Sequence, residues 1–156
     1  MIKIFLAVVL AYSVALSYEM DYTKETEGLV KKLKVHKGPN WVAKIELTNG
    51  KKVFFVSPKA MIEFYHHPGK WFDVGVKSED DFKDIIVTDF TTLKPINARG
   101  AFYVYGSNMV SPAGDDLPAF ATYEAADKYA KEHNGKRILN FKEIPEALIK
   151  LLNGRI

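Results

Sequence analysis

Cysteine is absent from this chain of 156 residues. Its absence excludes disulfides, thiolate nucleophiles and cysteine-ligated metal sites, and it also excludes a lipid anchor on an N-terminal cysteine. Small secreted folds often depend on disulfides, so this chain must be stabilised by its hydrophobic core. Ten Phe, eight Tyr and two Trp supply the bulk of that core, because each aromatic side chain can bury a large area.

A strong net charge and catalytic motifs are also missing. The formal charge is +3, which is too small and too scattered to indicate a nucleic-acid partner. The chain contains no G-x-S-x-G elbow, no H-E-x-x-H helix and no glycine-rich phosphate loop. We therefore expect that the protein is not an enzyme.

Only one long hydrophobic run is present, and it lies at the N-terminus. Lys3 precedes a nearly unbroken apolar stretch at residues 4–16. Ala15-Leu16-Ser17 then matches an A-x-S cleavage site. This pattern predicts a signal peptide over residues 1–17, because a membrane-spanning helix needs about 20 apolar residues. An uncleaved anchor is the alternative. Cleavage after Ser17 would release a periplasmic protein with no stable membrane insertion, and it would remove one lysine, so the formal charge would fall from +3 to +2.

Two stretches 65 positions apart share one pattern, an apolar strand end followed by a hydroxyl residue and a helix. Ser57 and Thr122 are suited to cap the two helices, and Pro58 is at a position where proline is tolerated. Pro68-Gly69 and Asn134-Gly135 predict the helix ends.

Strands are expected before and after each of these helices. Asn49-Gly50 predicts a tight hairpin in the first half. The expected strands are Trp41–Leu47, Lys52–Val56, Ile85–Val87, Ala101–Tyr105, Pro118–Ala121 and Lys136–Phe141, with a last helix at Pro145–Leu152. The pattern predicts an α+β fold of two ββαβ subdomains with antiparallel sheets. We expect an N-terminal polar segment at residues 18–40, a first subdomain at 41–90 and a second at 91–156, with the boundary near Asp89–Lys94.

The run from Ala98 to Phe120 carries a family resemblance. It reads as an aromatic strand at 101–105, then Gly106-Ser107, then a polar turn with Pro112 and Gly114, then a short strand that ends at Phe120. This run resembles the signature of the NosL family, whose members are accessory proteins that help to mature the copper centres of nitrous oxide reductase. The resemblance covers about residues 35–144 and also implies two ββαβ subdomains.

The resemblance places metal ligands at positions where this chain has other residues. Alignment on Trp41 puts the family's two cysteines at Gly28 and Lys31 and a methionine at Leu33. In the signature turn, the family's methionine corresponds to Ala113 and its histidine to Asp115.

The remaining soft ligands are few, and most have a structural interpretation. Met61 is on the predicted core face of its helix, and His66, His67 and His133 are at helix ends, where histidine can interact with the last carbonyl groups and the dipole. Asp115 and Asp116 are expected to be solvated turn acids. Met109, His36 and Met20 are the candidate metal ligands, and together they would make a three-coordinate Cu(I) site.

Two functions follow from these observations. The first is a periplasmic accessory protein that assists copper delivery to nitrous oxide reductase, or maturation of that enzyme, with the reductase or another assembly protein of the pathway as its partner. The alternative is a metal-free interaction module that retains the fold without the copper site. Such a module would contact its partner through exposed aromatic residues around Trp71-Phe72 or Tyr103–Tyr105.

Overall fold

The computed structural model of the protein describes residues 17–155. The predicted signal peptide therefore lies almost entirely outside the described residues. Within the described part of the chain, no helix combines the length and the apolar character needed to cross a bilayer.

The first sheet has four antiparallel strands in the order β2-β1-β3-β4. Its strands are β1 (Ala43–Leu47), β2 (Lys52–Phe55), β3 (Phe82–Thr88) and β4 (Pro95–Asn97). The predicted hairpin at Asn49-Gly50 joins β1 to β2, and Gly50 has a φ of 87° that favours glycine. In the centre of the sheet, Ile45 pairs with Val53 on one side and with Ile85 on the other. These residues are buried, so the register places apolar side chains in the core.

The second sheet has three antiparallel strands in the order β8-β5-β9. These are β5 (Phe102–Tyr105), β8 (Ala119–Phe120) and β9 (Arg137–Asn140). A separate small hairpin of β6 (Val110–Ser111) and β7 (Gly114–Asp115) is inserted between β5 and β8. The predicted α+β fold with antiparallel sheets is confirmed.

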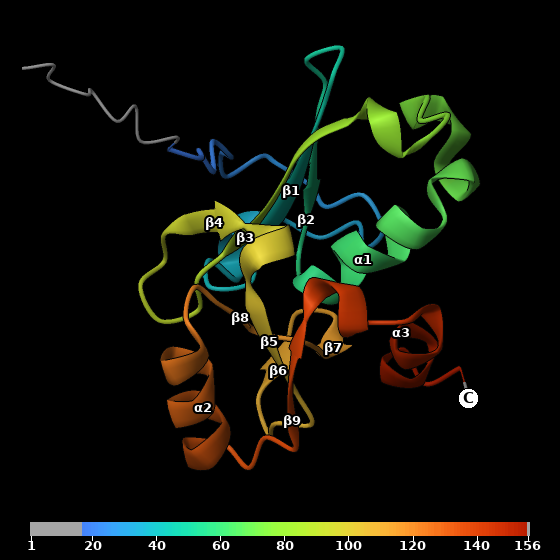
Figure 1. Ribbon diagram of the computed structural model, residues 1–156. Helices are drawn as coiled ribbons and strands as arrows, with labels where there is room; N and C mark the ends of the chain where they lie inside the picture. The colour runs from blue at the N-terminus through green and yellow to red at the C-terminus, as the bar shows by residue number, and fades with distance from the viewer. Residues whose placement is uncertain (1–16, 156) are drawn as a thin grey trace, which may run out of the picture.

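Three α-helices complete the fold: α1 (Pro58–His66), α2 (Tyr123–Glu132) and α3 (Glu146–Leu152). The predicted caps are present, because the Ser57 hydroxyl accepts a hydrogen bond from Ala60 N–H and the Thr122 hydroxyl accepts one from Ala125 N–H, each at 3.2 Å. Helix α1 packs on β1 and β2 and against α3, whereas α2 packs on the second sheet. Figure 1 shows α1 and α3 on one side of the molecule and α2 on the other.

Five short 3-10 segments connect these elements. They are η1 (Val35–Lys37), η2 (Pro68–Val74), η3 (Glu79–Asp81), η4 (Ala98–Gly100) and η5 (Phe141–Glu143). Each half of the chain thus contains the ββαβ order, with β1, β2, α1 and β3 in one half and β5, β8, α2 and β9 in the other. Strand β4 lies after residue 90, yet it pairs with β3 and extends the first sheet.

One large hydrophobic core joins the two halves. It includes Ile45 and Phe64 from the first half, and Tyr103 and Leu139 from the second. A smaller cluster under α2 contains Phe120 and Tyr129. The halves are therefore packed together over a shared apolar interior, which fixes the position of the loops that connect them.

Candidate functional site

The signature loop between β5 and β8 is anchored to the start of α1 through Lys59. Lys59 is in the first turn of α1, and its side chain is only 1% exposed. Its Nζ donates a hydrogen bond to the carbonyl oxygen of Ala113 at 2.7 Å and a longer one to the carbonyl oxygen of Leu152 at 3.4 Å. One buried ammonium group thus connects the β6–β7 turn with the end of α3.

Asp116 is the second buried charged residue of this loop. Its Oδ1 accepts hydrogen bonds from the backbone N–H groups of Lys59 and Leu117, each at 2.9 Å, and its Oδ2 accepts one from the Ser111 hydroxyl at 2.7 Å. Only 3% of Asp116 is exposed, so the interpretation of Asp116 as a solvated turn acid is wrong. Asp115 is exposed, as predicted. The side chain of Asp116 faces inward because it satisfies buried N–H groups at the start of α1 and in the loop itself.

Burial and nearby charges act on both ionisable groups. Burial lowers the pKa of the Lys59 ammonium and Lys31 acts in the same direction, whereas Asp116 and Asp115 raise it. Burial raises the pKa of the Asp116 carboxyl group, and its hydrogen bonds act in the opposite direction. A buried cation at the start of α1 and a buried acid in the loop therefore act on each other's charge.

The segment that the resemblance aligns with a cysteine motif forms a tight loop beside β2. The Gly28 N–H donates to the Leu33 carbonyl at 2.9 Å, and the Leu29 N–H donates to the Phe54 carbonyl at 2.8 Å. A Cβ atom at Gly28 would lie 2.8 Å from the Lys31 carbonyl oxygen and 3.1 Å from the backbone nitrogen of Val56. This backbone contact excludes a cysteine side chain at residue 28 in the present loop conformation.

His36 lies beside the closed end of the β6–β7 hairpin. It is in η1, and a Cβ atom on the nearby Gly38 would lie 2.9 Å from Cγ of Pro112 in the hairpin turn. The His36 Nδ1 atom is buried and has no hydrogen-bond partner among the described residues. His36 therefore combines proximity to the signature turn with a free ring nitrogen.

Met109 lies at the open end of the same hairpin, immediately before β6. Met109 is 38% exposed. The N–H group of the preceding residue, Asn108, donates a hydrogen bond to the His133 carbonyl at 2.9 Å. Met109 is thus close to the end of α2, whereas His36 is next to the hairpin turn.

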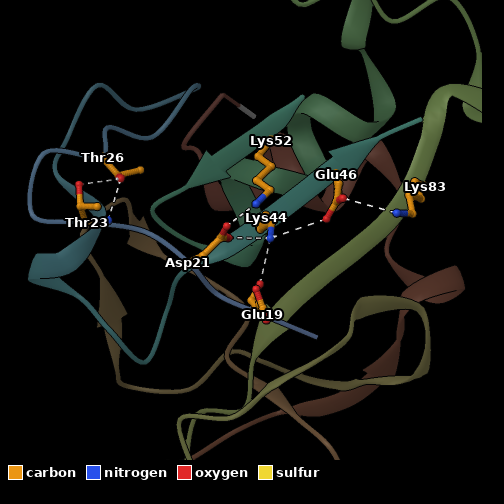
Figure 2. A network of polar contacts seen from close by, with 8 residues as sticks. All are labelled: Glu19, Asp21, Thr23, Thr26, Lys44, Glu46, Lys52 and Lys83. Atoms are coloured by element: carbon orange, nitrogen blue, oxygen red, sulfur yellow. Dashed lines mark hydrogen bonds and ion pairs between the residues drawn. The ribbon is translucent and has the colours of Figure 1, made fainter. Parts of the chain in front are cut away.

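Met20 occupies a third place, in the N-terminal segment along the first sheet. It is half-buried and packs against the main core. Figure 2 shows its neighbours Glu19 and Asp21 bound to Lys44, whose Nζ lies 3.0 Å from the Glu19 carbonyl oxygen and 2.8 Å from Asp21 Oδ1. The described contacts do not bring Met20, His36 and Met109 together, and no group of three or more His, Cys, Asp or Glu residues suited to hold a metal ion occurs within residues 17–155.

The other methionine and histidine residues have structural contacts. Met61 is fully buried, as its packing interpretation predicted. His66 Nε2 lies 3.1 Å from the Ile144 carbonyl oxygen, and His67 Nε2 lies 2.6 Å from Glu146 Oε1. These two histidines therefore connect α1 with the segment around α3 and do not cap their own helix with their side chains.

The two aromatic surfaces predicted for a metal-free module differ in exposure. Phe72 is 86% exposed, and Trp71 is half-buried. Tyr103 is fully buried, and its hydroxyl donates to the Ala98 carbonyl at 2.6 Å. The expectation of exposed aromatic residues at Tyr103–Tyr105 is therefore wrong for Tyr103, because this strand lies inside the shared core.

The elements and the loop contacts define an α+β protein with antiparallel sheets. Comparison with known proteins then identifies the family, because the NosL family model matches residues 19–149. The chain belongs to the NosL family. This membership agrees with the prediction that the protein is not an enzyme.

A solved structure has the same fold. The crystal structure of the copper chaperone NosL from Shewanella denitrificans superimposes with a TM-score of 0.71 at 19% sequence identity, covering 85% of this chain and 99% of that chain. No curated protein matches the chain.

Proposed function

We propose that this protein is a periplasmic accessory protein that assists copper delivery to nitrous oxide reductase, or maturation of that enzyme. The proposal rests on the family match over residues 19–149, which includes the complete signature loop. The solved relative of the same fold is a copper chaperone. The same proposal includes export by a signal peptide that is cleaved after Ser17. N-terminal sequencing of the protein isolated from the periplasm should then give Tyr18 as its first residue.

Cu(I) is the proposed cargo, and Met109 and His36 are the first ligands to test, with Met20 as the third. Thioether and imidazole groups are suitable ligands for Cu(I). Met109 is solvent-accessible and His36 has an unpaired Nδ1 atom. Both residues can serve one site only if the Met109 sulfur and a His36 ring nitrogen each reach about 2.0–2.3 Å from the same ion.

An anaerobic competition titration of residues 18–156 with Cu(I) against a chromogenic chelator tests this proposal. We expect one equivalent to bind, and we expect Met109→Ala and His36→Ala each to weaken binding by about tenfold or more, since each removes one ligand. Val110→Ala is the matched control, because Val110 is the next residue, is 60% exposed and has no ligand atom. An unchanged affinity in Met109→Ala would remove Met109 from the site, and the absence of competition at any stoichiometry would refute copper transport by this chain.

A second candidate function is a metal-free module that binds the reductase or an assembly protein. The buried Lys59 ammonium at the signature turn favours it, because a cation in this place opposes the binding of a metal ion. Phe72 is the exposed aromatic side chain that such a module would use.

Binding of the purified protein to metal-free nitrous oxide reductase, measured with and without a Cu(I) chelator, separates the two functions. A metal-free module should bind equally well in both conditions and should lose affinity in Phe72→Ala. Tyr123→Ala is the control, because Tyr123 is another exposed aromatic residue, with 52% exposure. Loss of binding on chelation would refute the metal-free function.

A further inference from the structure

Lys59 contacts Ala113, one of the positions that the family resemblance assigns to metal ligands. Its ammonium group is bonded to the carbonyl of Ala113, and it is 4.0 Å from the place of a Cβ atom on Gly114. The charges of Lys31 and Asp115 both act on it. Residues far apart in the sequence thus converge on one buried cation.

The residues around this point do not fit a copper ion. Cu(I) prefers thiolate and thioether ligands, but the groups that contact the Lys59 ammonium are the carbonyl oxygens of Ala113 and Leu152. Asp116, Asp115 and Glu63 favour the charged form of Lys59, whereas Lys31 disfavours it. Hard carbonyl oxygens and nearby carboxylates thus suit an ammonium group better than they suit Cu(I).

We propose that the Lys59 ammonium takes the place of a metal ion in this protein, where it holds the signature turn against the end of α3 and closes this site to Cu(I). The ammonium donates hydrogen bonds to the carbonyl groups of two half-buried residues, Ala113 and Leu152. It also places a positive charge beside the carbonyl groups of the signature turn and α3. The proposed Cu(I) ligands Met109, His36 and Met20 are not among the groups that the Lys59 ammonium contacts.

The effect of the charge is large enough to measure. Two like charges about 4 Å apart at an effective dielectric constant of about 20 repel strongly enough to weaken binding by about a thousandfold. Relaxation of the lysine side chain reduces this effect, so we expect at least about a hundredfold. Removal of the charge should therefore restore Cu(I) affinity only when soft ligands are also supplied.

The experiment uses a ligand-restored variant of the full mature chain, with Lys31→Cys, Ala113→Met and Asp115→His. Lys59→Gln is then added, because glutamine removes the charge, retains a donor for the Ala113 carbonyl and provides no soft ligand. Lys83→Gln in the same background is the matched control, since Lys83 is an exposed lysine of β3 and glutamine again removes a charge without adding a soft ligand. Cu(I) affinity is measured anaerobically with a chromogenic chelator.

We expect the ligand-restored variant that retains Lys59 to bind Cu(I) at least about a hundredfold more weakly than the variant with Lys59→Gln, and we expect Lys83→Gln to have no effect. Equal affinities with and without Lys59 would overturn the proposal. Weaker binding after Lys59→Gln in variants shown to be folded by near-ultraviolet circular dichroism would also overturn it.

A second measurement on the wild-type chain does not depend on the folding of any variant. Cu(I) is added while the NMR signals of the Lys59 ammonium and the Ala113 amide are followed. These signals should stay unchanged, even if the signals of Met109 and His36 shift. If the signals of Lys59 and Ala113 shift while the first equivalent of Cu(I) binds, the proposal is overturned. Failure to bind the reductase would instead refute the accessory function and would leave the Lys59 result unaffected.

Discussion

Asp89 is the residue whose replacement tests most directly how the two halves of the protein are joined. It is 3% exposed and follows the last residue of β3. Its Oδ1 accepts hydrogen bonds from the N–H groups of Thr91 and Thr92, each at 2.9 Å, and its Oδ2 accepts one from the Ala121 N–H at 2.8 Å. The carboxylate thus connects the first sheet to the residue that precedes the cap of α2.

Asp89→Asn preserves the size of the side chain but replaces one acceptor oxygen with a donor nitrogen. The single amide oxygen can serve either the two threonine N–H groups or Ala121, so at least one N–H group loses its partner and meets another donor. These N–H groups belong to exposed residues and their bonds are part-buried, so the lost bond costs about 1 kcal/mol, and the loss of the charge weakens the remaining bonds. We expect the free energy of unfolding to fall by about 1–2 kcal/mol.

Urea denaturation of residues 18–156, followed by tryptophan fluorescence, measures this change. Trp41 is a local probe, because its ring centroid lies 5.0 Å from that of Phe90, the residue next to Asp89. Asp127→Asn is the control, since it breaks an exposed pair with Lys131 that is worth at most about 0.5 kcal/mol. A loss below about 0.5 kcal/mol in Asp89→Asn, or a loss equal to that of the control, would refute the reasoning.

Two further predictions concern single polar contacts. Hydrogen bonds from Lys44 and Lys52 lower the pKa of Asp21 to about 2, so the stability from this contact is complete above the unfolded-state pKa near 4 and is lost as the pH falls toward 2. Because Asp21 is partly solvated, we expect this contact to contribute only about 1 kcal/mol to the free energy of unfolding. Asp21→Asn should therefore reduce the pH dependence of the free energy of unfolding between pH 4 and 2. A pH dependence equal to that of the wild type would contradict this prediction. Tyr103→Phe should lower the free energy of unfolding by about 1 kcal/mol in urea denaturation, because the buried Ala98 carbonyl loses its short bond from the hydroxyl and keeps only the longer one from the Ala101 N–H at 3.4 Å; a neutral effect would show that the bond from the Ala101 N–H is sufficient.

Local signals predicted most of the secondary structure. Ser57 and Thr122 cap their helices as expected, because a hydroxyl group bonds an amide only three residues away. The hairpin at Asn49-Gly50 likewise depends only on residues that are neighbours in the sequence. By contrast, the pairing of β4 with the first sheet was not predicted, since residues 95–97 carry no local signal that selects β3 as their partner.

In the candidate site, too, features that depend on neighbouring residues were predicted and contacts between distant residues were not. The signature loop was identified from its own residues, and the family match confirms that identification. Lys59 was not singled out, because a lysine in the first turn of a helix is ordinarily solvated. Its burial depends on Ala113 and Leu152, which are 54 and 93 residues away. The assignment of Met109, His36 and Met20 to Cu(I) stays a prediction.

The sequence by itself determined the α+β fold class, the capped helices, the first hairpin and the NosL family, because each depends on contacts between near neighbours or on one continuous run of residues. Only the tertiary structure decided which charged groups are buried. Asp116 and Lys59 have the same ionisable chemistry as exposed aspartate and lysine residues elsewhere in the chain. They differ because the packing of α1, the signature loop and α3 removes them from water and supplies distant backbone groups as partners.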